Sequence, residues 1–404
     1  MNTASSPAFR RSRTTWLGYT ILGYHTLLQA LVSAVVPFLR AELNLNYAQA
    51  GLYMSANAAG MVLAGLSGDR LADRFGRRAV LWGAASGTLL GLLCLALGAQ
   101  TWVTLSGAFL CGYLGSLTMV IVQSLLSDLH GEQRGIAISE ANISAGVGSF
   151  AAPLLASAAV ISGLGWRAAP GVVAGLIGLA ALVFRRAPFP PSRPECAENG
   201  RARLSPAFWR LWGVMFLSVS VEWSVIFWSA DFLEKIGGLS RAASVSWLGA
   251  YFSAAVIGRF AASRLLRRQP VHRLLIAAQG VSAAGILLFW LAPLPAARIA
   301  GLFLAGLGIG NLFPLGVVEA VGAAPQAPNL ASARATLAAG LAISTAPLFV
   351  GVVADRVGIH GAYGLTLILL AASAGLHTAR LRHAAAFPVK SRTFPPAWPV
   401  RPPA

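Results

Sequence analysis

Gly68-Asp69-Arg70-Leu71-Ala72-Asp73-Arg74-Phe75-Gly76-Arg77-Arg78 is a short, strongly cationic stretch between two long apolar segments. A second version lies 190 positions later, at Gly258-Arg259-Phe260-Ala261-Ala262-Ser263-Arg264-Leu265-Leu266-Arg267-Arg268. At that offset the opening glycines and three arginines of the two stretches coincide. One basic hairpin between hydrophobic helices, repeated in both halves of a 404-residue chain, predicts a duplicated membrane bundle.

The composition points to the same class of protein. The chain is 56% hydrophobic and only 11% charged, and its mean hydropathy is +0.67. Apolar runs of about 20 residues recur along its length, each long enough to cross the roughly 30 Å hydrocarbon core as a helix. A soluble protein of this length would need a more polar surface. We therefore predict an all-α integral membrane protein.

The apolar runs predict twelve transmembrane helices in two six-helix bundles. The spans lie at about 16–39, 48–67, 79–98, 102–127, 136–161, 166–184, 209–232, 243–263, 272–293, 296–319, 330–353 and 361–380. The bundles are expected at 16–184 and 209–380, and the proline- and arginine-bearing stretch 185–208 is expected to be the linker between them. Residues 1–15 form an N-terminal segment, and residues 381–404 form a proline-rich tail that the composition predicts to be disordered.

The net charge of +18 reports orientation rather than nucleic-acid binding. Only six of the 31 lysine and arginine residues lie outside the segments on the N-terminal side of the membrane: Arg40, Arg167, Lys235, Arg241, Arg298 and Arg356. This positive-inside distribution places both termini in the cytoplasm. The basic segments would also attract anionic lipid headgroups of the bilayer.

The sequence contains no pattern typical of a cofactor or metal site. Cys94 and Cys111 lie within apolar spans and Cys196 lies in the linker, without paired ligand spacing. No Walker-type glycine loop is present, which argues against an ATP-driven pump. We expect no cofactor and no bound metal.

The residues around Asp73 resemble the signature loop of the major facilitator superfamily, roughly G-x-L-a-D-R-x-G-R-R. The matching residues are Leu71, Ala72, Asp73, Arg74, Gly76, Arg77 and Arg78, whereas Asp69 stands at the first glycine. Arg134-Gly135 and Gly165-Trp166-Arg167 match further loops. The resemblance implies a twelve-helix bacterial carrier of a small solute that works by alternating access, is monomeric and is not an enzyme.

Two departures from the family bear on the direction of transport. Drug–proton antiporters of this superfamily often carry an arginine in the fourth helix, where Ala108 stands here. Their glycine-rich pattern in the fifth helix reads Gly148-Ser149-Phe150-Ala151-Ala152-Pro153-Leu154-Leu155-Ala156-Ser157, with most glycines replaced. Proton-coupled uptake is therefore favoured, and efflux of drugs or metabolites by proton antiport stays the alternative.

The duplication also predicts two ion pairs between the bundles. At an offset of 194, Glu140 corresponds to Arg334, and at the earlier offset Asp69 corresponds to Arg259. In this family the second helix packs against the eleventh and the fifth against the eighth. Asp69 would then pair with Arg334, and Glu140 with Arg259, closing the cytoplasmic side. The alternative is that these residues are solvated at the membrane ends.

A second set of charges would brace each bundle near the basic hairpins. By analogy with the family, Asp128 would face Arg74, and Glu319 would face Arg264 or Arg267. Asp73 would contact the start of the eleventh helix while the cytoplasmic side is shut, and Arg77 and Arg78 complete the switch cluster. Ordinary surface ion pairs, worth about 0–1 kcal/mol each, are the alternative.

The transport site is expected near mid-membrane, where polar side chains are costly and face inward. The family implies a lining by helices 1, 4, 7 and 10, helped by 2, 5, 8 and 11. Glu222 is the only carboxylate near the middle of any predicted span. It would be a proton carrier or a ligand for a cationic or hydroxylated solute, or else a permanently neutral, hydrogen-bonded acid. His25 and Gln29 lie one helical turn apart and share a face. His25 would exchange protons or serve in packing.

Further candidate ligands are Asn57, Asn311 and Trp223. The two asparagines would equally serve to join helices, and the tryptophan would stack on a ring of the solute. No arginine lies near the middle of a predicted span, which disfavours dicarboxylates and phosphorylated solutes. An excess of arginine over lysine indicates a GC-rich bacterium, and hence its inner membrane. A membrane enzyme or a channel is the remote alternative, but no nucleophile–base constellation is present and duplicated halves suit a rocking motion.

Overall fold

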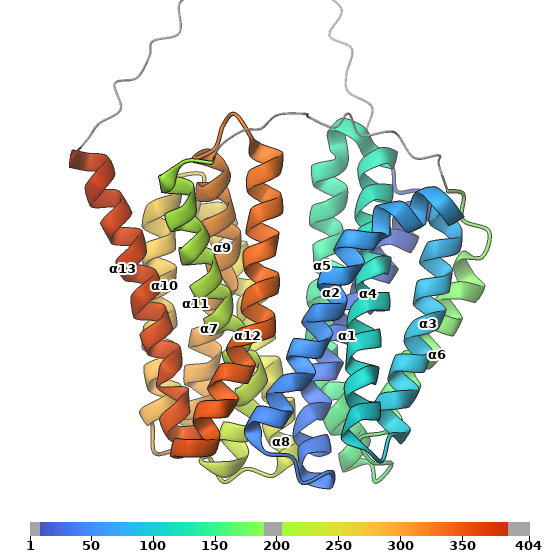
Figure 1. The fold of residues 1–404 in the computed structure, drawn as a ribbon, viewed down its shortest axis with the longest axis horizontal. Coiled ribbons are helices and arrows are strands. Elements are labelled where there is room, and N and C mark those ends of the chain that lie inside the picture. The colour runs from blue at the N-terminus through green and yellow to red at the C-terminus, as the bar shows by residue number, and fades with distance from the viewer. Residues whose placement is uncertain (1–8, 190–203, 387–404) are drawn as a thin grey trace, which may run out of the picture.

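The structure is a computed structural model that describes residues 9–189 and 204–386. The first group of helices, blue to green in Figure 1, occupies one side of the molecule. It comprises α1 (Arg13–Glu42), α2 (Tyr47–Phe75), α3 (Arg77–Leu97), α4 (Thr101–His130), the 3-10 turn η1 (Gly131–Gln133), α5 (Arg134–Ile161) and α6 (Ala168–Phe184).

The second group of helices, yellow-green to red in Figure 1, occupies the other side. It comprises α7 (Pro206–Lys235), α8 (Arg241–Ser246), α9 (Leu248–Leu265), α10 (Val271–Leu291), α11 (Pro295–Gly322), α12 (Pro328–Tyr363) and α13 (Leu365–Ala386). Helices α8 and α9 follow one another with only Trp247 between them, and together they make one span. The described residues thus form twelve spans, which confirms the predicted fold class.

Length and hydropathy support this count. Within residues 9–189 and 204–386, nine segments are long and apolar enough to cross a membrane, and α6 and α13 are shorter apolar helices. The twelfth span is α2, whose last turns carry Asp69 and Asp73. Several helices extend beyond the predicted apolar runs, because helical hydrogen bonding continues into the polar flanks. Of the predicted linker, residues 190–203 lie outside the described residues, as does the tail after residue 386.

The two ends of the molecule differ. Helices α1 and α7 begin, and α13 ends, at the upper end in Figure 1, which we call the terminus end. The short helix α8 lies at the opposite, loop end. Ser12 and Ser205 cap the starts of α1 and α7 by accepting a backbone N–H of the first turn.

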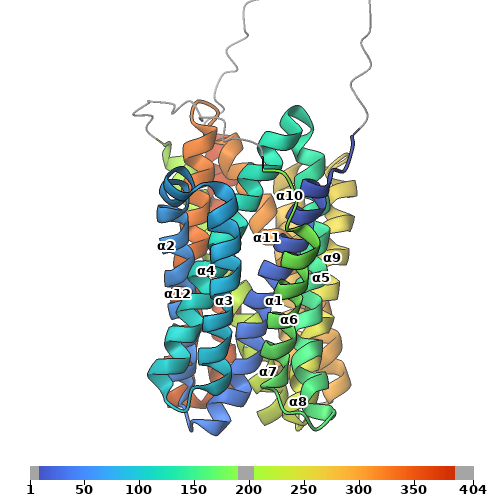
Figure 2. The same ribbon diagram turned by 90° about the vertical axis from the view of Figure 1, so that its right-hand side faces the viewer.

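Contacts between the two groups lie toward the loop end. Helix α2 packs against α12, α5 against α8 and α9, and α1 against α7, and Figure 2 shows α2 beside α12 from a second direction. The Ser55 hydroxyl donates to the carbonyl of Ser344 at 2.5 Å, and the Ser157 hydroxyl donates to the carbonyl of Ala242 at 2.8 Å. These helix pairs agree with the pairing that the family resemblance implies.

Within each group, small residues let the helix backbones approach closely. A Cβ added at Gly112 of α4 would lie 2.0 Å from the backbone oxygen of Asn57 in α2, and one at Gly148 of α5 would lie 2.1 Å from that of Gly23 in α1. The second group shows the same feature, since a Cβ at Gly285 of α10 would lie 2.2 Å from the backbone nitrogen of Ala305. Each group is therefore closely packed around its own glycines.

Gly112→Ala is expected to destabilise the protein, because the new methyl group meets the α2 backbone and not a movable side chain. Forced overpacking of this kind costs about 1–3 kcal/mol, which we expect as a clear drop in the thermal unfolding temperature of detergent-purified protein. Gly175→Ala in α6 is the matched control, because nothing lies within 4 Å of its would-be Cβ. Equal unfolding temperatures for both variants would contradict the packing argument.

Candidate functional site: a cavity between the helix groups

A cavity of about 270 Å³ lies between the two groups of helices. It is lined by His25, Thr26, Gln29, Ala30 and Ser33 of α1, Met61 of α2, Asn142, Ala145, Gly146 and Ser149 of α5, Glu222, Trp223 and Ile226 of α7, and Tyr251, Phe252, Ala255, Val256 and Arg259 of α9. Both groups thus contribute to one polar cavity.

The wall formed by α1 presents polar groups that lack partners. His25, Gln29 and Ser33 follow one another at intervals of four residues and therefore share a face. Gln29 is only 6% exposed and Ser33 only 2%, yet within the described parts of the chain neither amide atom of Gln29 nor the Ser33 hydroxyl has a hydrogen-bond partner. Buried polar groups are normally satisfied, so these atoms are suited to a solute in the cavity.

The His25 ring has a defined orientation. Its Nδ1 lies 3.0 Å from the backbone carbonyl of Gly115 in α4. A carbonyl only accepts, so Nδ1 carries the proton and donates. Nε2 makes no hydrogen bond with another described residue and is the nitrogen that can accept from a solute or gain a proton.

The opposite wall holds the cavity's carboxylate. The Tyr251 hydroxyl of α9 donates to Oε1 of Glu222 in α7 at 3.5 Å. No lysine or arginine of the described chain lies within ion-pair distance of Glu222. Arg259 lines the same cavity, and its Nε donates to the carbonyl of Gly310 at 2.9 Å. Trp223 and Phe252 add aromatic surface.

The structure brings together four of the six candidate ligands: Glu222, Trp223, His25 and Gln29. Asn57 and Asn311 do not line this cavity. The amide of Asn57 donates across to the carbonyl of Ala108 in α4 at 3.2 Å, and that of Asn311 donates to the carbonyl of Leu307 within α11 at 2.8 Å. In this conformation Asn57 joins α2 to α4, as in the alternative interpretation, whereas the Asn311 amide bonds within its own helix.

The expected lining is also only partly observed. None of the residues lining this cavity comes from α4, α11 or α12, although helices 4, 10 and 11 were expected to contribute. Close packing at Gly112 places α4 directly behind α2, and Gly115 lies against the side chains of His25 and Gln29. Helix α4 therefore supports the wall formed by α1 without reaching the cavity itself.

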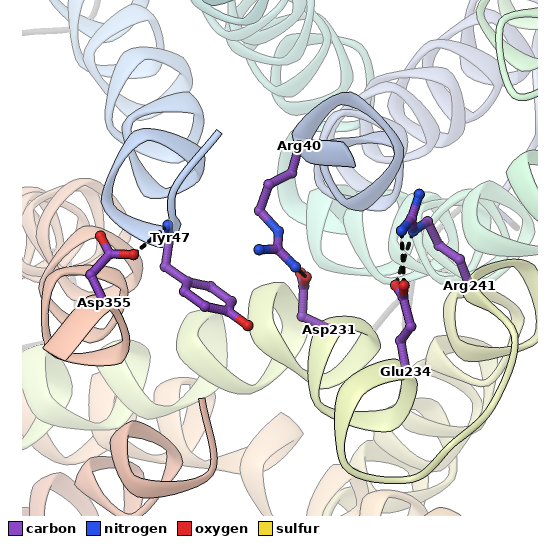
Figure 3. Close-up of polar contacts among 6 residues, drawn as sticks. All are labelled: Arg40, Tyr47, Asp231, Glu234, Arg241 and Asp355. Carbon is purple, nitrogen blue, oxygen red and sulfur yellow. Dashed lines mark hydrogen bonds and ion pairs between the residues drawn. The ribbon is translucent and has the colours of Figure 1, made fainter. Parts of the chain in front are cut away.

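The loop end is closed by an ion pair between the groups. Arg40 at the end of α1 donates from Nη2 to Asp231 of α7, as Figure 3 shows. The Asp231 side chain is 1% exposed and the Arg40 side chain 14%. The Arg40 guanidinium also lies over the Tyr47 ring, 4.3 Å from its centroid. This buried contact joins the first group to the second.

A second contact at the loop end involves a helix terminus. Asp355 of α12 accepts from the backbone N–H groups of Tyr47 and Ala48 at 2.8 and 2.9 Å, and Figure 3 shows its carboxylate beside Tyr47. These are the first residues of α2, so a carboxylate of one group caps a helix of the other. The pair Glu234–Arg241 in the same view joins α7 to α8 within one group.

The ion pairs predicted between the groups do not form in this conformation. Asp69 and Arg334 are exposed and make no ion pair among the described residues. Glu140 is bound by Arg11, at 2.5 Å, and accepts from the Tyr19 hydroxyl at 2.8 Å. The predicted partner of Glu140, Arg259, lines the cavity instead. The observed contacts between the groups lie farther toward the loop end, which leaves these residues apart.

The ion pairs observed within each group differ from those that were expected. Asp128 pairs with Arg77, at 2.6 Å, rather than with Arg74. Gly76 has φ 81° and ends α2, so Arg77 begins α3, which packs on α4. Arg74 lies over the Phe75 ring instead.

The remaining switch candidates have other contacts. Glu319 contacts His377 of α13 at 3.3 Å, and Arg264 lies over the Phe260 ring. Arg78 donates to the carbonyl of Arg185. Asp73 is exposed.

Sequence reasoning did not identify Ser33, Tyr251, Arg40, Asp231 or Asp355 as members of a site. Only Asp355 carries a signal that could have found it. Ala354-Asp355-Arg356-Val357-Gly358 repeats the pattern Ala72-Asp73-Arg74-Phe75-Gly76 of the signature loop. Gly358 and Gly76 also share a left-handed backbone, with φ 76° and 81°.

Comparisons with known proteins identify relatives along nearly the whole chain. A family model described as Major Facilitator Superfamily matches residues 19–326. An uncharacterised MFS-type transporter of Yersinia pestis is 26% identical over 377 residues, covering 91% of this chain and 95% of the relative. One of Pseudomonas aeruginosa is 27% identical over 399 residues, covering 90% of this chain and 91% of the relative.

Solved structures share the fold. A bacterial homologue of the human lysosomal transporter Spinster, in an inward-facing and occupied conformation, matches with a TM-score of 0.78 at 17% identity, over 94% of this chain and 98% of that one. The nucleoside transporter NupG matches with a TM-score of 0.70 at 14% identity, over 92% of this chain and 98% of that one. At these identities the likeness concerns the fold alone.

Asp231→Asn is expected to loosen the closure of the loop end, because it removes the charge that holds Arg40. The expected change in the opening equilibrium is about 5- to 150-fold, the range for a coupling of about 1–3 kcal/mol. The measurement is the labelling rate of a cysteine placed at Ile226 in the cavity, in a chain without native cysteines. A membrane-impermeant thiol reagent is supplied only at the loop-end side of reconstituted vesicles.

Glu234→Gln is the matched control, since Glu234 pairs with Arg241 inside one group. Exchanging the charges, with Asp at position 40 and Arg at position 231, should restore slow labelling. If Asp231→Asn labels no faster than Glu234→Gln, the Arg40–Asp231 pair does not hold the loop end shut.

Proposed function

The chain belongs to the major facilitator superfamily, and from that premise we propose that it carries a small organic solute across the membrane together with protons, by alternating access. Membership in this family of transporters bears out membrane solute transport, and it agrees with the prediction that the chain is not an enzyme. The substrate, the coupling ion and the direction are the proposed part.

One observation carries the proposal: a cavity between the two groups contains a carboxyl and an imidazole that are both available to protons. Glu222 has a hydroxyl neighbour but no ion-pair partner, so gaining or losing a proton breaks no salt bridge. His25 has one ring nitrogen bound to Gly115, and the other makes no hydrogen bond with another described residue. Groups of this kind at the solute site can couple solute binding to protonation.

The asymmetry between the two ends supports alternating access. Arg40–Asp231 and the Asp355 cap join the groups at the loop end. The predicted pairs Asp69–Arg334 and Glu140–Arg259 would form at the terminus end in the opposite conformation. Contacts shift such an equilibrium only if they form in one state and break in the other. In that state, Glu140 would exchange Arg11 for Arg259.

Orientation and location follow from the charge distribution. We propose that the terminus end faces the cytoplasm, because the basic segments of the sequence gather there. The protein would then reside as a monomer in a bacterial inner membrane. Uptake by symport is preferred over proton-antiport efflux, because the arginine and glycine marks of the antiporters are replaced at Ala108 and along 148–157.

Glu222→Gln is expected to abolish coupling, because a glutamine of similar shape cannot exchange a proton. Proteoliposomes are challenged with sugars, organic acids, amino compounds and dyes while the internal pH is recorded. Solute-driven proton flux should fall by at least about tenfold, which corresponds to a loss of about 1.4 kcal/mol. Solute counterflow should persist in the variant.

Glu234→Gln serves as the matched control here too, because this carboxylate lies outside the cavity. The sign of the pH change in the wild type distinguishes uptake symport from antiport efflux. Undiminished coupled flux in Glu222→Gln would remove Glu222 from the coupling step, and solute movement without proton flux in the wild type would refute proton coupling.

A further inference from the structure

We infer that the cavity binds a small organic monoanion, held by Arg259, and that this anion and the proton on Glu222 bind cooperatively. The inference rests on the proposed function and names the substrate class for the same site. Arg259 and Glu222 are the only Arg, Lys, Asp or Glu residues among those that line the cavity. With His25 on the α1 wall, the cavity contains one fixed cation and two groups whose charge depends on a proton, and Glu222 is the one whose ionised form offsets Arg259.

Arg259 is arranged to accept an anion. Its Nε is held by the Gly310 carbonyl at 2.9 Å, which orients the guanidinium. The two Nη groups make no hydrogen bond or ion pair with any described residue. A planar guanidinium with free Nη donors suits a carboxylate, which it can bind through two parallel hydrogen bonds.

The α1 wall supplies the remaining recognition groups. The amide of Gln29 and the hydroxyl of Ser33 are more than nine-tenths buried, line the cavity and have no hydrogen-bond partner among the described residues. An amide and a hydroxyl can donate to and accept from hydroxyl or carbonyl groups of a solute. A cavity of about 270 Å³ restricts that solute to a small molecule. A small carboxylate that also carries a hydroxyl or keto group can bind Arg259 on one wall of the cavity and Gln29 and Ser33 on the other.

The two charges explain why proton and anion would bind together. While Glu222 is ionised, its charge offsets that of Arg259, and an added anion would leave the cavity with uncompensated negative charge. Once Glu222 is protonated, the charge of Arg259 is available to the anion. Arg259 is exposed and Glu222 half-buried, so water screens this coupling in part. Excess charge of one sign in a small cavity is still unfavourable, and each ligand therefore raises the affinity for the other.

Arg259 was expected to be a gate residue, and dicarboxylates and phosphorylated solutes were disfavoured because no arginine lies near the middle of a span. Arg259 lies eight residues, or about 12 Å of helix, beyond Tyr251 toward the terminus end, and it still lines the cavity. A solute with one negative charge matches this single cation, whereas a doubly charged solute would exceed it. Dicarboxylates and phosphorylated solutes therefore stay disfavoured, because each would bring more negative charge than this one cation matches.

The test compares the solutes that drive proton flux in wild-type proteoliposomes. Glycerate, gluconate and 4-hydroxybenzoate are assayed beside their uncharged amides, within the mixed panel. We expect a monoanion, and not its amide, to drive flux and to bind more tightly at pH 5.5 than at pH 8. Arg259→Gln should weaken its binding at least tenfold, and Arg259→Lys should weaken it less.

Arg273→Gln, an exposed arginine of α10 outside the cavity, is the control and should bind as the wild type does. Because binding is measured on purified protein whose unfolding temperature is checked, a folding defect is distinguished from a binding defect. Proton flux driven only by neutral or cationic solutes would overturn the inference while leaving the proposed function intact. Anion binding by Arg259→Gln at wild-type affinity would also overturn it.

A separate observation concerns the two helices that carry the repeated pattern. We propose that Asp355 is the loop-end counterpart of Asp73, so that α2 and α12 cap one another alternately. The two helices pack side by side and run in opposite directions. Helix α2 ends in Ala-Asp-Arg-x-Gly, and α12 carries the same pattern at the kink where Gly358 interrupts its helical backbone near the loop end. Each aspartate therefore lies at the end of its helix that is nearest to the start of the other.

Only one of the two caps is made in this conformation. Asp355 accepts from both Tyr47 and Ala48 at the start of α2. At the terminus end, the start of α12 has Ala327 at its N-cap position and no side-chain cap, and Asp73 is exposed. The family resemblance implies a contact between Asp73 and this helix start when the terminus end is shut. Our proposal adds that the Asp355 cap on α2 is exchanged for the Asp73 cap on α12 when the molecule changes conformation.

Opposite effects of the two substitutions test this proposal. With the Ile226 cysteine as the probe, Asp355→Ala should raise labelling from the loop-end side about fivefold or more, and Asp73→Ala should lower it. Asp355→Asn should stay closer to the wild type, because asparagine also caps helices. Combining both alanines should return the rate toward that of the wild type. Shifts in the same direction, or none, would overturn the proposal.

Discussion

Charged side chains within membrane-spanning helices need partners, because their surroundings screen charge weakly. At the loop end, the partners come from the opposite group of helices. Asp231 is matched by Arg40, and Asp355 is matched by the free N–H groups at the start of α2. These contacts hold the two groups together at one end of the cavity.

The close packing within each group makes such end contacts effective. At Gly112 and Gly148 the backbones of neighbouring helices are so near that a single added carbon would meet a carbonyl oxygen. Each group is therefore expected to move as a body, and a small set of polar contacts between the groups can then determine which end is open. Close packing also explains why α4 supports His25 through the Gly115 carbonyl without lining the cavity.

Periodicity and composition predicted much of the fold, but they did not assign partners. The apolar runs located the twelve spans, and Glu222 was identified because a carboxylate in mid-span is rare. Asn57 and Asn311 were candidate ligands by residue type and depth, yet the Asn57 amide bonds to the backbone of α4 and the Asn311 amide to the backbone of its own helix. Which face of a helix meets a neighbour depends on packing. Asp128 was placed beside Arg74 by analogy with the family, whereas the turn at Gly76 brings Arg77 to it instead.

The sequence by itself determined that the chain is a duplicated bundle of membrane helices, because the length of an apolar run and the recurrence of the basic hairpin are properties of the chain alone. Only the tertiary structure decided which side chains share the cavity. Glu222, Arg259 and Gln29 come from three helices far apart in the chain, and their proximity depends on how those helices rotate and tilt when they pack. The closure of the loop end was decided in the same way, since Arg40 and Asp231 are 191 residues apart and meet only when the two groups assemble.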